Sequence, residues 1–164
     1  CASLLTIISE RLLMRLIPID PGNEAHLKAL YELLAEREPS ASISHKVMPT
    51  WEQHLEFVRV MDGTTLPEAS RRALSYKAWY LVFPSIDDVC LGAVYLTRQD
   101  EVGVSIFKAW TGNGFGAKAV RLLMEKHGPR RYLANINPSN EASRKMFEKL
   151  GFRTIQHTLA LEAE

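Results

Sequence analysis

A glycine-rich loop that joins an expected strand to an expected helix constrains the fold of this chain more than any other feature. Glycines stand at 112, 114 and 116, after "EVGVSIF" at 101–107, whose β-branched pattern predicts a strand. The residues that follow predict a helix in which Phe115, Ala119 and Leu122 share one face. Glycine lets backbone N–H groups approach an anion, and the positive end of a helix attracts one. The unit therefore predicts a pyrophosphate site.

Three other interpretations of the loop were weighed against this one. Gly112, Gly114 and Ala117 satisfy the G-x-G-x-x-A pattern of dinucleotide sites, but such sites open a larger βαβαβ unit with an acidic residue at the next strand end. The next strand here ends at Ile136-Asn137 instead. A P-loop needs Gly-Lys-Ser/Thr, which this loop lacks. A tight strand-to-helix turn that binds no ligand remains the alternative.

The other elements predict one α/β (α+β) domain over residues 1–164, a length that suits a single core. We expect a strand at 12–18, helices at 23–38 and from Thr50, and an antiparallel meander at 77–83, 89–97 and 101–107. After the loop and its helix come a strand at 131–136, a helix with Asn137-Pro138 at its start and Gly151 at its end, and one or two strands within 152–162. The result is a mixed, mostly antiparallel sheet with helices on its faces.

Charge and cysteine content exclude several classes of function. Lys and Arg number 20 against 19 Asp and Glu, so no overall field attracts nucleic acid or an anionic membrane. Cys1 and Cys90 belong to no Cys/His cluster, which argues against a metal site and a disulfide framework. The opening "CASLLTIISERLLMRLI" is too short and too charged for a membrane span and lacks signal-peptide order. We expect a cytoplasmic protein without a metal, nucleic-acid or membrane partner.

Two sequence motifs, which follow each other along the chain, resemble those of a known family. Thr111, Gly114 and Gly116 match a Q/R-x-x-G-x-G/A loop with Thr in the first place. An N-x-x-S/A-x-x-x-Y/F-x-x-x-G-F pattern is matched downstream by Asn140, Ser143, Phe147, Gly151 and Phe152. Together they resemble the GNAT superfamily of N-acetyltransferases, especially its branch that includes ribosomal-protein alanine acetyltransferases. The well-matched region covers residues 77–155, and the first half agrees mainly in element order.

The resemblance implies a GNAT fold with six or seven strands, about four helices and a splayed strand pair that holds acetyl-CoA. It implies that the backbone of Val104, Ser105 and Ile106 pairs with the pantetheine amides and that Asn140 and Ser143 contact the cofactor. The pyrophosphate would be held by the loop residues Thr111, Gly112, Asn113, Gly114, Phe115, Gly116 and Ala117. Two positions depart from the family pattern: Thr111 replaces Gln or Arg, and Phe147 replaces a Tyr that can donate a proton.

The implied activity is direct acetyl transfer from acetyl-CoA to a primary amine, which needs a base and an oxyanion donor. For the base we favour Glu101, which begins the strand expected to carry the acetyl group, with His54 on the second helix as another candidate. The alternatives are a solvated strand-end charge and a helix-surface histidine. The acceptor would be a small-molecule or peptide amine, and homodimers are common in the family. A non-catalytic acyl-CoA-binding module is the competing function.

Overall fold

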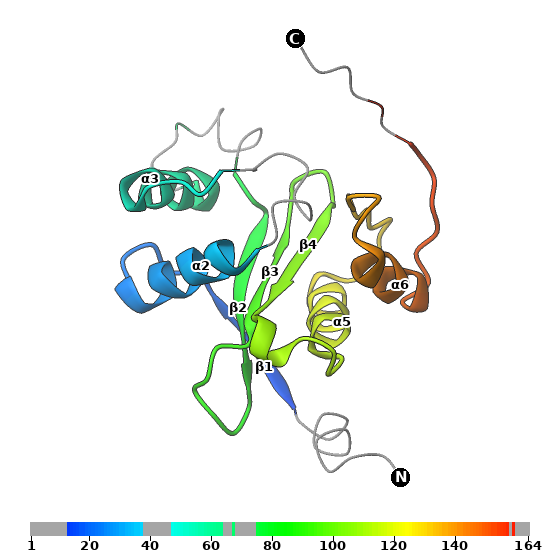
Figure 1. The fold of residues 1–164 in the computed structure, drawn as a ribbon, viewed down its shortest axis with the longest axis horizontal. Coiled ribbons are helices and arrows are strands. Elements are labelled where there is room, and N and C mark those ends of the chain that lie inside the picture. The colour runs from blue at the N-terminus through cyan, green and yellow to red at the C-terminus, as the bar shows by residue number, and fades with distance from the viewer. Residues whose placement is uncertain (1–12, 38–46, 64–66, 68–74, 158, 160–164) are drawn as a thin grey trace.

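A four-stranded antiparallel sheet lies at the centre of the computed structural model, which describes residues 13–37, 47–63, 67, 75–157 and 159 (Figure 1). Its strands follow in chain order: β1 (Met14–Pro18), β2 (Ala78–Pro84), β3 (Gly92–Leu96) and β4 (Val102–Ile106). Each strand pairs antiparallel with the next. The predicted meander is therefore confirmed, and β4 forms one edge of the sheet.

Helices cover both faces of this sheet, with α2 (Glu24–Glu36) and α3 (Trp51–Asp62) on one side and α5 (Phe115–His127) and α6 (Glu141–Lys149) on the other (Figure 1). The start of α3 is fixed by a capping box, in which Thr50 and Gln53 bond each other's backbone N–H groups. A short 3₁₀ turn, η2 (Lys108–Trp110), links β4 to the glycine loop. The described residues thus contain the four predicted helices.

The alternation of the strands divides the core into two layers. Val94, Val102 and their neighbours pack with Ala119 and Leu123 of α5. On the opposite face, Leu81 and Ala93 pack with Leu27, Leu30 and Leu33 of α2 and Val58 of α3. Because side chains alternate along a strand, the odd-numbered residues of β4 face α2 and the even-numbered residues face α5.

The predicted count of six or seven strands is not confirmed. The segment 131–136 makes one parallel bridge, Glu101 with Leu133, and the described part of 152–159 forms no strand. A strand exists only where a neighbour completes its ladder, and the segment after Leu133 leaves β4 at once. The link at 63–76 lies mostly outside the described residues.

The start of α6 also differs from the prediction. Asn137 accepts hydrogen bonds from the backbone N–H and the hydroxyl of Ser139, at 3.0 and 2.8 Å, and so forms a turn before the helix. The N-cap is Asn140, whose side-chain oxygen accepts the N–H of Ser143 at 3.1 Å. Gly151, with φ of 93°, follows the C-cap Leu150 as expected for a helix end.

We expect Leu123→Ala to destabilise the fold by about 2 to 5 kcal/mol, because Leu123 is fully buried between α5 and the sheet. Chemical denaturation measures the change. Glu125→Ala, at an exposed position of the same helix, is the matched control and should change stability by less than about 0.5 kcal/mol. Equal effects of the two substitutions would contradict the packing described for α5.

Candidate functional site

The edge of β4 is paired at one end and open beyond it. Val102 donates its N–H to the Leu133 carbonyl at 2.8 Å, and Leu133 donates to the Asp100 carbonyl at 3.0 Å. Beyond this bridge, β4 is the last strand of the described sheet. The family resemblance implies a splayed strand pair here; the structure shows one bridge followed by separation, with no second strand in the segment 131–136.

The ladder to β3 decides which groups of β4 face this edge. Phe107 donates its N–H to the Leu91 carbonyl at 3.0 Å, and Ser105 lies opposite Ala93. Since hydrogen-bonded positions alternate along an antiparallel pair, the backbone groups of Ser105 belong to the β3 side. The N–H and C=O groups of Val104 and Ile106 point to the open edge, as those of Val102 do. Of the three predicted backbone contacts, two therefore face the edge and Ser105 does not.

The glycine loop presents backbone N–H groups to solvent. Gly112 and Gly114 both have φ of 78°, and a Cβ added to either would meet nothing within 4 Å. Gly114 is the N-cap of α5 and offers no side chain, so the amides of Phe115, Gly116 and Ala117 have no side-chain cap. On the same first turn, the Lys118 ammonium is buried with no hydrogen-bond partner in the described part of the chain. The loop and the helix N-terminus that follows it have the backbone donors of an anion site.

The polar side chains of the loop hydrogen-bond to nearby backbone carbonyls. The Thr111 hydroxyl donates to the Lys108 carbonyl at 2.9 Å. The Asn113 amide donates to the carbonyls of Trp110 and Thr111, at 3.2 and 3.1 Å. These bonds fix the conformation of the loop. Because they engage the side chains, the backbone N–H groups are the groups available to a ligand.

The second motif lies against the first. A Cβ on Gly116 would lie 3.0 Å from the Met146 sulfur and 3.6 Å from Ile106, so α5, α6 and β4 meet closely there. The Asn140 side chain accepts the backbone N–H of Ser143 as the cap of α6, which gives Asn140 a structural role. The Phe147 ring is buried and packs edge-on against Phe152, with centroids 5.0 Å apart. Phe147 is thus a core residue.

Glu101 is a partly buried carboxylate with defined partners, not a solvated strand-end charge. Its Oε1 accepts a hydrogen bond from the Asn135 side chain at 2.8 Å, and its Oε2 accepts one from the Thr97 hydroxyl at 3.4 Å. The first of these bonds ties the segment after Leu133 to the start of β4. Glu101 therefore lies where the two segments begin to separate.

His54 lies in the contact between α2 and α3 and not at the β4 edge. Its side chain is buried, its Nε2–H donates to the Leu27 carbonyl at 3.0 Å, and its ring contacts Tyr31 and Trp51. Burial lowers the pKa of the imidazole, and the bond to Leu27 opposes this only in part. The histidine is thus a neutral packing residue, and the structure does not bring it together with Glu101.

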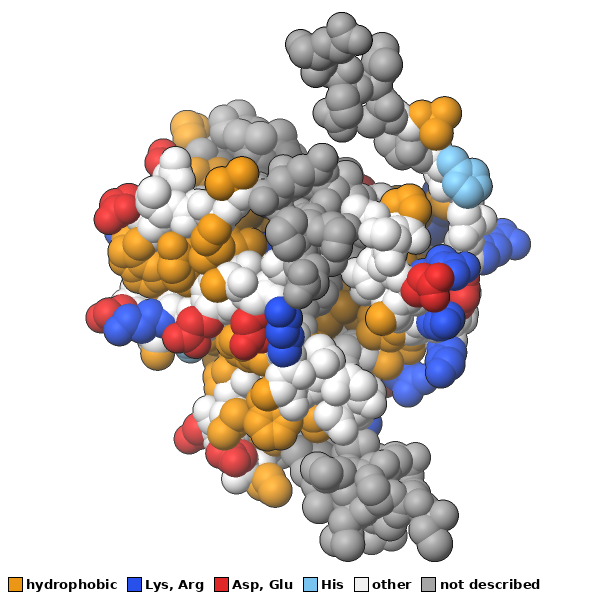
Figure 2. Space-filling view, in the orientation of Figure 1, with side chains coloured by type: hydrophobic (Ala, Val, Ile, Leu, Met, Phe, Trp, Pro, Cys, Tyr) orange, Lys and Arg blue, Asp and Glu red, His pale blue; other side chains and the backbone are white. Residues whose placement is uncertain are grey.

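Two basic residues of α6, Arg144 and Lys145, form exposed ion pairs within their own helix. Arg144 lies 3.6 Å from Glu148, and Lys145 lies 3.5 Å from Glu141. Figure 2 shows Lys and Arg side chains gathered on this flank of the molecule. Asp88, in the β2–β3 connection, pairs with Arg15 and lies apart from this flank.

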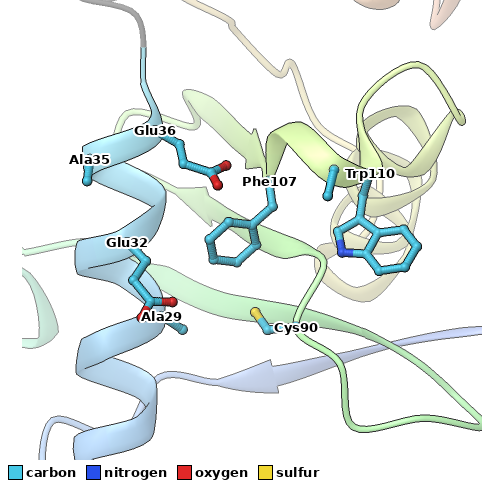
Figure 3. Close-up of a pocket in the computed structure, with 8 residues that line it drawn as sticks. Ala29, Glu32, Ala35, Glu36, Cys90, Phe107 and Trp110 are labelled. Atoms are coloured by element: carbon cyan, nitrogen blue, oxygen red, sulfur yellow. The ribbon is translucent and has the colours of Figure 1, made fainter.

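A cavity of about 530 Å³ lies between α2 and the end of β4 and was not predicted (Figure 3). Glu32 and Glu36 point from α2 toward Phe107, and Trp110 closes the far side. Glu36 also accepts the N–H of Lys108 at 2.8 Å. Cys90 lines the cavity as well; burial raises the pKa of its thiol, so it is protonated and a poor nucleophile.

Comparison with known proteins identifies the family. The acetyltransferase (GNAT) domain family matches residues 14–153, and the chain belongs to it. No curated protein sequence matches the chain. Among the described residues, no helix has the length and apolar character needed to cross a bilayer, and no group of three or more His, Cys, Asp or Glu is placed to hold a metal.

Solved structures share the fold at low sequence identity. A domain from Methanocaldococcus jannaschii has a TM-score of 0.67 and 19% identity, over 90% of this chain and 92% of that one. An acetyltransferase from Thermus thermophilus has a TM-score of 0.67 and 18% identity, over 88% and 90%. RimL, a ribosomal L7/L12 α-N-protein acetyltransferase in complex with coenzyme A, has a TM-score of 0.63 and 18% identity, over 83% and 77%.

Mutation can show which of the two asparagines before α6 is the N-cap of the helix. We expect Asn140→Ala to cost about 1 kcal/mol of stability because a helix cap is lost, and Asn140→Asp to restore most of it. Asn137→Ala should cost less, since its bonds to Ser139 precede the helix. Denaturation without ligand is the measurement. A larger loss at Asn137 would place the cap where the sequence predicted it.

Proposed function

We propose that this protein is an N-acetyltransferase that transfers an acetyl group from acetyl-CoA directly to a primary amine. The observation that carries the proposal is the separation of β4 from the segment after Leu133, which leaves the backbone groups of Val104 and Ile106 open beside an uncapped helix N-terminus. A ligand with amides at one end and a pyrophosphate at the other matches this edge. The GNAT family and the coenzyme A complex of a structural neighbour support that ligand class.

The residues present fit such a ligand. Val104 and Ile106 would pair with the pantetheine amides, as a further strand would. The amides of Phe115, Gly116 and Ala117 would hold the pyrophosphate, and the empty space beside Gly112 and Gly114 gives the phosphates room. Since the Thr111 hydroxyl is already bonded to Lys108, this cradle is a backbone site.

The chain's own groups supply the remaining chemistry. The cosubstrate brings a thioester, whose carbonyl carbon an amine attacks. Glu101 takes a proton from the acceptor amine through water, as the N–C bond forms and the C–S bond breaks. A β4 edge amide, that of Val104 or Ile106, stabilises the charge on the carbonyl oxygen. The leaving thiolate takes a proton from solvent. Position 147 is Phe and not Tyr, so no hydroxyl donates there, and the low pKa of thiols makes such a donor unnecessary.

The backbone cradle predicts a specific effect of Gly114→Ala. A methyl group at φ of 78° costs about 1 to 2 kcal/mol of stability and enters the space expected for phosphate. Loss of one amide–phosphate bond should weaken CoA binding about tenfold to a hundredfold, as measured by calorimetry. Gly128→Ala is the control at the other end of α5, because Gly128 has a similar φ of 77° and open surroundings, although its ψ of 174° differs from the 3° of Gly114. Equal CoA affinity in both variants would exclude the cradle.

The role of Glu101 predicts the effect of Glu101→Gln. Glutamine can still accept the Asn135 bond, so CoA should protect the variant from thermal unfolding as it protects the wild type. The rate of free-thiol release with an amine panel should fall at least about a hundredfold, because the base is lost. Asp88→Asn, which removes an exposed carboxylate from the β2–β3 connection, should keep full activity. If CoA protects the wild type but no amine releases thiol, the non-catalytic module is the correct function.

A further inference from the structure

Tyr95 of β3 lies across β4 because Gly103 has no side chain. The two residues are directly opposite each other in the ladder. A Cβ placed on Gly103 would lie 2.0 Å from Cζ of Tyr95 and 2.3 Å from its hydroxyl. The far end of the ring therefore rests on the backbone of Gly103, next to Val104. This brings the hydroxyl over the strand whose open edge is expected to hold the acetyl thioester.

Other aromatic side chains hold the Tyr95 ring in this position. Tyr76 stacks parallel to it, with centroids 4.4 Å apart and an interplanar angle of 4°. Trp79 packs edge-on against Tyr76 at 5.0 Å. Tyr76 is itself fixed by its N–H, which donates to the Met61 carbonyl at the end of α3 at 2.8 Å. A ring held on two sides keeps its hydroxyl in one place, as a substrate contact requires.

The hydroxyl lies on the face of β4 opposite α5. On the α5 side, Gly116, Met146 and Ile106 are in close contact and fill the space beside the edge. Tyr95 and Gly103 are on the α2 side, where Glu101 and Arg37 are near enough to act on the hydroxyl. Burial raises the pKa of Tyr95, Arg37 and a hydrogen bond from the Tyr76 hydroxyl oppose this, and Glu101 adds to it. The group is therefore an uncharged phenol at neutral pH.

We infer that Tyr95 is a substrate-contacting residue whose hydroxyl oxygen accepts a hydrogen bond from the N–H of the acceptor amine, an inference that rests on the proposed acetyl transfer. The bond turns the nitrogen lone pair toward the thioester carbon, while Glu101 receives the proton that the nitrogen loses. A tertiary amine has no N–H to donate, so the contact selects primary and secondary amines. Gly103 is the residue that makes this contact sterically accessible.

Tyr95→Phe tests the inference, because it keeps the ring and removes only the hydroxyl. Thiol release is followed with 1,3-diaminopropane, glucosamine and an alanyl tripeptide. For the amines that react, we expect the KM for the amine to rise about fivefold to tenfold, with the KM for acetyl-CoA unchanged. Tyr132→Phe, which removes a hydroxyl bonded to the Met124 and Gly128 carbonyls at the end of α5, is the control and should change the amine KM by less than about twofold. An unchanged amine KM in Tyr95→Phe overturns the inference.

A binding measurement separates failure of this inference from failure of the proposed function. Each amine is added at saturating concentration to the wild-type CoA complex, and the further rise in unfolding temperature is recorded. We expect a rise with at least one amine that is clearly smaller in Tyr95→Phe and in Gly103→Ala, whose added Cβ displaces the ring. A CoA shift without any amine increment overturns the role of Tyr95 and leaves the cofactor site standing. Absence of a CoA shift overturns the proposed function itself.

Discussion

The single bridge between Glu101 and Leu133 is the contact on which the candidate site depends. Two backbone hydrogen bonds join the segments there, and the Glu101 carboxylate accepts a further hydrogen bond from the Asn135 side chain. If the segments stayed paired, Val104 and Ile106 would have a protein partner and no ligand could bond them. If they never met, the edge of β4 would have no fixed neighbour. One bridge thus gives an edge that is both open and held in place.

Much of this arrangement could be predicted from local sequence signals. The capping box at Thr50, the three-strand meander and the uncapped helix after the glycines depend on neighbours within a few residues. The strand expected at 131–136 could not be judged in this way, because its side chains look the same with or without a ladder partner. The helix start was misplaced for a similar reason, since Asn137 and Asn140 are both good caps and only their bonds distinguish them.

Site residues were harder to predict because their roles come from tertiary packing. His54 is a polar residue on an amphipathic helix, and only the approach of α2 shows that it bonds a carbonyl and is buried. Tyr95 and Gly103 were missed although a signal existed. A turn centred on Gln99 places them opposite each other, and a glycine facing an aromatic residue allows that ring to cross the strand. The pairing register of a hairpin is thus informative about function as well as fold.

The short length of the open edge has a consequence for self-association. An unpaired strand edge invites pairing with another chain, and longer flat edges are the most hazardous. In the described part of the chain, the bridge at Leu133 occupies one end and η2 turns the chain away at the other, so Val104 and Ile106 are the only residues of β4 with both backbone groups unpaired at this edge. Two positions are too few to support an intermolecular sheet, yet they suffice for a small ligand. The free protein can therefore keep this edge unpaired with little risk of intermolecular strand pairing.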